Sequence, residues 1–475
     1  MTLVLIIDVL VVAGLVGITL TKGLERALPF FAFVIVFVPR ESKILLPGLF
    51  ALTTWRVAIA TLTILYLLFK NDTNQDERVI ANIPLKYLLV IHLTWCAIST
   101  ANSVVPADSF KQMLATLVEY YLMYCIVIRT VTSTQTINKI LGAMVIAVGL
   151  ACVAGVFEAY SSWRITQWFP PAEHDFNFAA SGEGRGDRII STFGNYSLFG
   201  AAIAFAIVEV FYFLQSAKGA ARKFFLWAAL ILMFWVIYKT ITRGPWLALV
   251  IGFCMVLLYC QARTRRHMLL IVALCVAVCV IRPGVWDTVK NIAVTTVATD
   301  DPNNVMAASY EYRWTLWHVG VNALAREPAR TLWGYGMASF FELHLTAPFL
   351  DNPAYVFESC DNAWVQQMVE TGYVGLFLLA ILLGTPTVLT LRNVWKIPKP
   401  DNYLCWVLFI NMVQYYFMMT NVAIYGWGQT GYMLWMWIAM AMIYPALKQA
   451  ESTAERANSA QPVELKPQWM GLATA

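Results

Sequence analysis

Long apolar runs separated by short polar connections dominate the chain, and several approach or reach the ~20 residues with which a helix crosses a bilayer. Hydrocarbon offers no partners for backbone N–H and C=O groups, so each such run is predicted to be an α-helix. The short run at 28–38 could be part of a hairpin, so the pattern predicts 12 or 13 crossings. The predicted spans are residues 3–20, 28–38, 44–69, 84–98, 110–128, 140–159, 196–214, 224–241, 245–260, 268–281, 364–391, 403–420 and 430–447.

One long polar stretch interrupts this pattern late in the chain. Between Arg282 and Asn362 about 80 residues are rich in aromatic side chains and also hold arginines, a histidine and carboxylates. We therefore predict an all-α polytopic membrane protein with one large, partly helical periplasmic loop before the last three spans. The predicted division is a transmembrane bundle at 1–281, the loop at 282–363, the last transmembrane helices at 364–447 and a disordered cytoplasmic tail at 448–475.

Composition agrees with a membrane protein and excludes a soluble domain of this size. Charged residues make up 13% of the chain, about half the usual share in soluble proteins. The net charge of +5 is spread over many loops, so we expect no nucleic-acid partner. Eight of nine cysteines lie in or beside apolar runs, and no disulfide framework or metal-binding spacing emerges. The apolar N-terminus lacks a basic start and a cleavage site, which favours a retained span.

The distribution of lysine and arginine predicts the orientation, because cytoplasmic loops carry an excess of both. Basic connections, such as those with Lys22 and Arg26 or with Arg263, Arg265 and Arg266, alternate with poorly basic ones. Placing the basic set in the cytoplasm puts residues 161–195, the turn at Arg243 and the long loop outside. The N-terminus is then outside if every run is counted, and inside if residues 3–38 cross only once.

Three of the arginines on the predicted outer side stand out, because they lie there against this charge bias. Arg188 precedes a polar loop that re-enters the membrane, Arg243 lies in a tight turn between two spans, and Arg313 lies early in the long loop. A guanidinium group binds phosphate oxygens through a bidentate fork and stays charged at any relevant pH. Converging arginines would suit a diphosphate, whereas each arginine alone could also extend to lipid headgroups or pair with a carboxylate.

The long loop is predicted to contain a helix from Tyr312 to Ala325, with Trp314, Trp317, Val321 and Leu324 on one face. The turn Trp333-Gly-Tyr-Gly336 follows. No strand precedes its Gly-x-Gly, so a dinucleotide site is not expected and no cofactor is predicted. Aromatic rings of this loop could stack on sugars or lie in the membrane interface. The candidates for contact with a glycan are Trp314, Trp317, Trp333, Tyr335 and Asn362.

The end of the loop carries the candidates for a general base: Asp361, His344 and Glu358. Asp361 stands before the helix that runs into the next span, so it could also be only the N-cap of that helix. A carboxylate can take a proton at neutral pH if burial or a neighbouring like charge raises its pKa.

Several of these segments occur together, in order, over roughly residues 185–380. They are Arg188-Ile-Ile-Ser-Thr-Phe-Gly-Asn195, Thr242-Arg-Gly-Pro-Trp-Leu-Ala248, Arg313-Trp-Thr-Leu-Trp317, Pro328, Gly334-Tyr-Gly-Met-Ala-Ser-Phe340, Asp361-Asn362 and Glu370-Thr-Gly-Tyr-Val-Gly375. The ordered set resembles the bacterial O-antigen ligase and polysaccharide polymerase superfamily, whose members have about a dozen spans and a large external loop before the last few.

The resemblance implies metal-independent glycosyl transfer at the outer face of the inner membrane. The donor would be a glycan on undecaprenyl diphosphate, and the other partners would be an acceptor glycan, membrane lipids, a flippase and a chain-length regulator. By position, Arg188, Arg243 and Arg313 match the arginines thought to hold the diphosphate. Many members have His-Asn where this chain has Asp361-Asn362. Since that histidine is the proposed base of the ligases, the change favours a repeat-unit polymerase over a ligase.

Two other functions stay open from the residues. A ligase would transfer the finished glycan to a lipid or other acceptor. A transporter or flippase of lipid-linked sugars would be expected to show interrupted helices and internal pseudo-symmetry, neither of which the sequence shows, and the polar candidates gather on one side.

Overall fold

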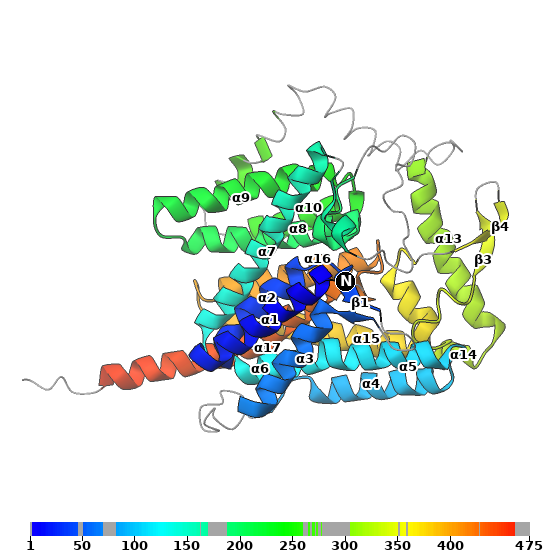
Figure 1. Ribbon diagram of the computed structural model, residues 1–475, viewed down its shortest axis with the longest axis horizontal. Coiled ribbons are helices and arrows are strands. Elements are labelled where there is room, and N and C mark those ends of the chain that lie inside the picture. The colour runs from blue at the N-terminus through cyan, green and yellow to red at the C-terminus, as the bar shows by residue number, and fades with distance from the viewer. Residues whose placement is uncertain are drawn as a thin grey trace, which may run out of the picture.

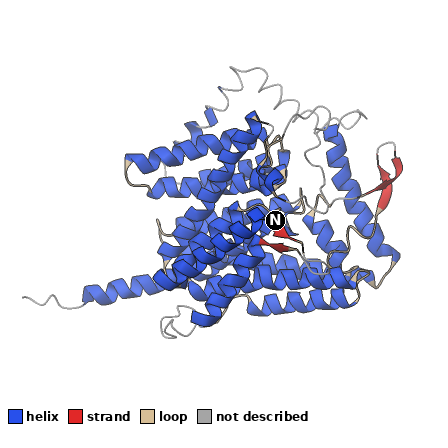
Figure 2. Cartoon of the chain, in the orientation of Figure 1, coloured by secondary structure: helices blue, strands red, loops and turns tan. Residues whose placement is uncertain are grey.

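The computed structural model describes residues 2–45, 51–69, 82–161, 163–169, 188–259, 305–349, 352–357, 360–426 and 428–460, and a few helical residues between 265 and 277. Helices make up almost all of it (Figures 1 and 2). The helices are α1 (Thr2–Lys22), α2 (Leu28–Phe37), α3 (Thr54–Phe69), α4 (Lys86–Ala101), α5 (Pro106–Ala115), α6 (Met123–Thr130), α7 (Thr134–Tyr160), α8 (Tyr196–Ser216), α9 (Ala220–Lys239), α10 (Arg243–Tyr259), α13 (Val305–Arg326), α14 (Arg330–Trp333), α15 (Ala363–Lys396), α16 (Asn402–Met419) and α17 (Gly428–Ala460).

Short elements connect these helices. They are the 3₁₀ turns η1 (Leu24–Ala27), η4 (Ile165–Trp168), η5 (Ser191–Phe193) and η6 (Ile424–Gly426), and the π-helical stretch η3 (Thr116–Leu122) between α5 and α6. Strands β1 (Lys43–Ile44) and β2 (Leu52–Thr53) pair antiparallel, as do β3 (Thr346–Phe349) and β4 (Asn352–Val356).

The predicted fold class is confirmed. Within the described residues, seven helices are long and apolar enough to cross a membrane, and α3, α4 and α10 are shorter apolar helices. The predicted run at 268–281 lies mostly outside the described residues. The run at 28–38 forms α2, a short helix of ten residues.

Two predicted boundaries need correction. Residues 44–69 were expected to form one helix, but the helix begins at Thr54 and residues on either side of 46–50 pair as β1 and β2. Pro47 and Gly48 in this segment disfavour a continuous helix. Tail residues 448–460 were expected to be disordered, but α17 continues to Ala460. Lys448 lies 3.2 Å from Asp401, and Glu451 accepts a hydrogen bond from the Thr134 hydroxyl at 2.6 Å, so both contacts hold the start of the extension against neighbouring segments.

The two ends of the bundle differ. Figure 1 shows α13, α14 and the β3–β4 hairpin together at one end, on the right, and the last turns of α17 leaving at the opposite end. We call these the outer end and the cytoplasmic end, after the predicted orientation. Asp8 accepts a 2.6 Å hydrogen bond from Thr54 at the outer end, and the Val38 carbonyl contacts Gln429 there. The α1–α2 pair is therefore a hairpin whose two ends both lie at the outer end.

The outer segment has an apolar core of its own. Leu316, Val319 and Ala323 of α13 are buried against the start of α15, together with aromatic residues of the hairpin such as Phe349 and Phe357. A Cβ placed on Gly320 would lie 3.0 Å from Val365, so the missing side chain lets α13 approach α15 closely. Of the four residues predicted to share one face, Leu324 is buried and Val321 packs against this core, whereas Trp314 is 60% and Trp317 39% exposed.

The Trp333–Gly336 turn docks on a break in α15. Gly372 has φ 71° and ψ −179° inside that helix, which frees carbonyl groups of the preceding turn. The carbonyl of Val369 accepts from the Tyr335 N–H at 3.0 Å, and that of Glu370 accepts from the Gly336 N–H at 2.9 Å. A Cβ on Gly334 would lie 2.4 Å from the Glu370 carbonyl oxygen. The two glycines thus serve close backbone packing.

Candidate functional site

One turn at the outer end is contacted by the three segments that carry Arg188, Arg243 and Arg313. We call residues 420–429, which connect α16 to the first residues of α17, the outer turn. The Asn421 carbonyl accepts hydrogen bonds from Arg313, and the Gln429 amide donates to the Thr192 carbonyl at 3.1 Å. A Cβ on Gly244 would lie 3.3 Å from the Cβ of Asn421. Segments at 188–196, 243–246 and 313 therefore meet at the same end of the bundle, as the sequence predicts for the three arginines.

Arg313 joins the outer turn to the beginning of α15. Its Nε and Nη2 donate to the Asn421 carbonyl at 3.3 and 3.2 Å. Its Nη2 also lies 3.7 Å from Oδ2 of Asp361, and the two side chains are 29% and 35% exposed. The guanidinium is therefore fixed by a backbone acceptor and a carboxylate, but part of it remains open to a ligand.

The other two predicted arginines lie at the start of a helix or in the segment before one. Arg243 is the first residue of α10, so it lies where the outer turn meets the bundle. The guanidinium of Arg188 lies 4.4 Å from the centroid of the Tyr196 ring. The backbone beyond Arg188 is held by Glu158, which accepts from the Ile190 N–H at 3.1 Å and the Ser191 N–H at 2.7 Å.

Asp361 is not the N-cap of α15, so that alternative is wrong. The Asn362 side chain caps the helix instead, with its Oδ1 accepting from the backbone N–H groups of Trp364 and Val365 at 3.0 and 3.2 Å. Surrounding protein raises the pKa of the Asp361 carboxyl above its ordinary value, and the Arg313 guanidinium opposes this shift. The capping role of Asn362 leaves Asp361 available for chemistry.

The other two candidate bases lie elsewhere. His344 is exposed, has φ 43° and precedes β3. Glu358 lies outside the described residues. Of the three candidates, Asp361 is the one for which the structure gives a contact with a predicted arginine.

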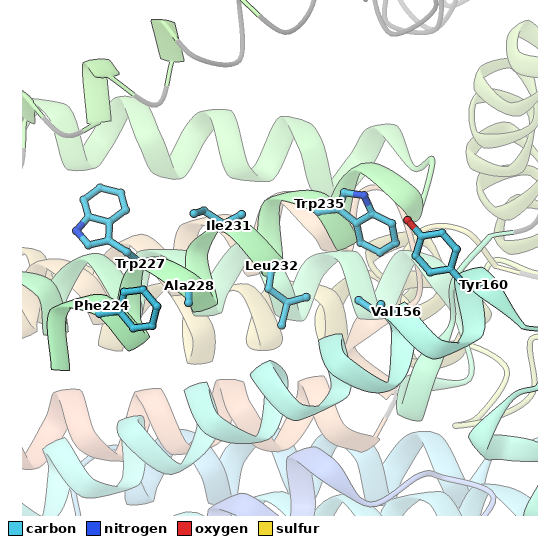
Figure 3. A pocket seen from close by; sticks show the side chains of 8 residues that line it. All are labelled: Val156, Tyr160, Phe224, Trp227, Ala228, Ile231, Leu232 and Trp235. Carbon is cyan, nitrogen blue, oxygen red and sulfur yellow. The ribbon is translucent and has the colours of Figure 1, made fainter. Parts of the chain in front are cut away.

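An apolar groove runs along the lipid-facing side of α7 and α9. Figure 3 shows the eight residues that line it, from Phe224 and Trp227 at one end to Trp235 and Tyr160 at the other. Its volume is about 690 Å³. The Tyr160 and Trp235 rings stack with centroids 5.8 Å apart, and the Lys239 ammonium lies 5.9 Å from the Trp235 ring. Because Lys239 ends α9 and Arg243 begins α10, the groove ends close to one of the arginine-bearing segments.

Comparison with known families shows which family part of the chain is similar to. Residues 228–380 match the model of the O-antigen ligase family. We call this segment, after the family that it is similar to, the O-antigen ligase domain. The matched segment runs from α9 into α15 and includes Arg243, Arg313 and Asp361, while Arg188 lies before it. The predicted resemblance to the ligase and polymerase superfamily is thereby confirmed. No curated protein matches the chain significantly.

The aromatic candidates within the O-antigen ligase domain separate into two groups. Trp314 and Trp317 are exposed on α13, and Trp317 is one helical turn from Arg313, so both can meet a ligand. Trp333 is half-buried at the end of α14. Tyr335 is only 7% exposed, and its hydroxyl donates to the Ala323 carbonyl at 2.8 Å. Tyr335 therefore offers little surface to a sugar.

A polar cluster before the O-antigen ligase domain was missed by the sequence reasoning. Arg56 on α3 donates to Glu119 at 2.7 Å, and the Tyr432 hydroxyl donates to the other oxygen of that carboxylate. Arg40, with Gln429 and Phe193, lines a small hollow behind the outer turn. The sequence signal that could have revealed this cluster is the charged pair Arg40-Glu41, which comes directly after the apolar run at 28–38 on the predicted outer side.

Proposed function

We propose that this protein is a polysaccharide polymerase that joins glycan repeat units carried on undecaprenyl diphosphate at the periplasmic face of the bacterial inner membrane. The observation that carries the proposal is the 3.7 Å approach of the Arg313 guanidinium to the Asp361 carboxylate, beside the outer turn. A cation for the leaving diphosphate and a base for the acceptor hydroxyl then belong to one site. The O-antigen ligase domain supports this class of reaction.

The proposed step is a displacement at the anomeric carbon of the donor glycan. The acceptor hydroxyl oxygen forms the new glycosidic bond, and its proton passes to Asp361. The bond between the anomeric carbon and the diphosphate oxygen breaks, and undecaprenyl diphosphate leaves with the electron pair. Arg313, Arg243 and Arg188 stabilise that negative charge. Fixed cations in a poorly hydrated site need little reorganisation as charge develops, which makes them effective.

The pairing of Arg313 with Asp361 couples the two halves of this step. In the structure the guanidinium lowers the pKa that burial raises. When a diphosphate draws the guanidinium toward itself, the carboxylate loses part of that stabilisation and becomes a stronger base. Donor binding would thereby prepare Asp361 to accept the proton of the acceptor hydroxyl.

The remaining substrate contacts follow the surfaces of the outer end. The polyprenyl chain would lie along the groove between α7 and α9, whose eight lining residues are apolar or aromatic. The exposed rings of Trp314 and Trp317 would stack on the sugars of donor or acceptor. In this proposal the reaction needs no metal ion, and the flippase and chain-length regulator of the same pathway are the expected partners.

A ligase is the second candidate, because the matching family is described as O-antigen ligase. Analysis of lipid-linked glycans in cells that lack the protein separates the two. Loss of a polymerase leaves single repeat units on undecaprenyl diphosphate in the outer leaflet. Long chains that stay on the lipid carrier would establish the ligase instead, and repeat units held in the cytoplasmic leaflet would point to transport and overturn both.

A further inference from the structure

A second hollow lies at the opposite end of the bundle, where α1, η1, α2 and α7 meet. Its volume is about 580 Å³, within the roughly 300–1,000 Å³ of small-molecule sites. Three cationic side chains surround its mouth: Lys22 at the end of α1, Arg26 of η1 and Lys139 of α7. Its floor is formed by Pro29, Thr136, Gly142, Ala143 and Ile146.

The three cations are open to a ligand. All three are exposed, and among the described residues none of them forms an ion pair with a carboxylate. Lys139 makes one long contact, 3.5 Å to the Gln135 amide oxygen. Some other cations of the described chain do have carboxylate partners, for example Lys448 with Asp401 and Glu451. The hollow therefore has unneutralised positive charge.

Glu25 is the one carboxylate that lines the hollow, and it is already occupied. It accepts from the Thr132 hydroxyl at 2.7 Å, the Thr132 N–H at 2.9 Å and the Ser133 N–H and hydroxyl at 3.1 Å. Burial would raise the pKa of Glu25, but these hydrogen bonds lower it below its ordinary value. Three cations and this one carboxylate leave a net charge of +2 around the hollow.

The apolar floor continues into the lipid-facing surface of α7. The side chain of Ile146 is 59% exposed. Leu150 and Val153 follow on the same helix, and their exposed fractions are 44% and 40%. Gly142 leaves room in the floor, since a Cβ there would meet only Phe213 at 3.7 Å. A ligand in the hollow thus has cations above it and an open apolar path beside it. That combination fits a phospholipid and does not fit a free phosphate.

We propose that this hollow binds an anionic phospholipid with two phosphates, of the cardiolipin class, from the cytoplasmic leaflet. The net charge of +2 matches two phosphate groups, and the exposed strip of α7 accommodates an acyl chain. Basic hollows between transmembrane helices on the cytoplasmic side have the chemistry that such headgroups require. The site is independent of the proposed glycosyl transfer.

The test measures lipid binding to the full-length protein in neutral detergent by native mass spectrometry, with cardiolipin, phosphatidylglycerol and phosphatidylethanolamine as probes. Cardiolipin is expected to bind about tenfold more tightly than phosphatidylglycerol and more tightly still than the neutral lipid. The variant K22Q/R26Q/K139Q should lose roughly fivefold in cardiolipin affinity per cation removed. The variant K218Q/R222Q/K223Q removes the same charge from the α8–α9 connection and should bind like the parent.

Equal loss of binding in the two triple variants would overturn the proposal, because bulk attraction would then explain the binding. Unchanged binding in K22Q/R26Q/K139Q, or equal affinity for all three lipids, would overturn it as well. Ala143→Trp keeps every charge and fills the floor, so cardiolipin affinity should fall about tenfold. Parent-like affinity of Ala143→Trp, with unchanged thermal unfolding, would exclude the hollow. Polymer synthesis is not the readout, so the result stands apart from the proposed function.

Discussion

The outer and cytoplasmic ends of the bundle use charge in different ways. At the outer end, Arg313 is held by a carbonyl and a carboxylate, and Arg56 is held by Glu119, so cations have defined positions. At the cytoplasmic end, Lys22, Arg26 and Lys139 are exposed around a hollow without ion pairs among the described residues. Fixed charges suit a transition state, since they need no reorganisation, whereas mobile charges suit a lipid headgroup that moves. For this reason we propose the chemistry at the outer end, beside Arg313.

The largest expected effect tests the base at that end. Asp361→Asn keeps the shape of the side chain but cannot take a proton, so polymer formation should fall by about 10²–10⁴-fold. His344→Ala should retain activity, because His344 is exposed and away from the Arg313 contact. In vitro polymerisation with purified lipid-linked repeat units measures both. Full activity of Asp361→Asn together with an inactive His344→Ala would move the base to His344.

The same residue sets the expected pH dependence. A base works only when deprotonated, so activity should fall as the pH falls through the pKa of Asp361. Because burial raises this pKa above the ordinary 3.8, the acid limb of the rate profile should lie above that value. The rate profile of the parent measures this limb. A parent profile without an acid limb above pH 3.8 would contradict the assignment.

The next effect concerns the diphosphate. Arg313→Ala should reduce polymer formation by roughly 10²–10³-fold, as expected for loss of one fixed group that stabilises developing charge. Arg326→Ala is the matched control, since Arg326 is an exposed cation at the end of the same helix. Single repeat units should accumulate on the lipid carrier in cells with the first variant only. Equal activities of the two variants would remove Arg313 from the site.

A smaller effect is expected from filling the lipid groove. Ala228→Trp places a large side chain in the groove between α7 and α9. The KM for the undecaprenyl-linked donor should rise roughly tenfold, because even a small change in an apolar pocket alters discrimination by about this factor. A donor with a short prenyl chain should be used normally. Ala60→Trp, at an exposed position of α3, is the control. The same KM for Ala228→Trp and its control would place the lipid chain elsewhere.

The smallest effect separates the neighbours Asp361 and Asn362. Asn362→Ala removes the cap of α15 and should destabilise the protein by about 1 kcal/mol. Asn362→Asp keeps a capping oxygen and should unfold at the same temperature as the parent, and so should Asp361→Asn. Thermal unfolding in detergent measures all three. A larger loss of stability in Asp361→Asn than in Asn362→Ala would reverse the two roles.

Features of this protein that depend on local forces are visible in the sequence, whereas features that depend on contacts between distant residues are not. The charge bias drew attention to Arg188, Arg243 and Arg313, because lysine and arginine gather in cytoplasmic loops and these three lie on the predicted outer side. The cap of α15 was misassigned by one residue, because Asp361 and Asn362 are both good N-cap types. Backbone geometry gives the role to Asn362, whose side chain accepts from the N–H groups of Trp364 and Val365.

The sequence by itself determined that this is a helical membrane protein, that one long polar stretch interrupts the apolar runs late in the chain and which family motifs the chain holds. These properties depend on apolar length and local charge, which act within a single segment. Only the tertiary structure decided that Tyr335 is buried, that the two glycines beside it pack on a break at Gly372, and that Asn421 and Gln429 connect the arginine-bearing segments. Those contacts join residues that are far apart in the chain, so no local pattern records them.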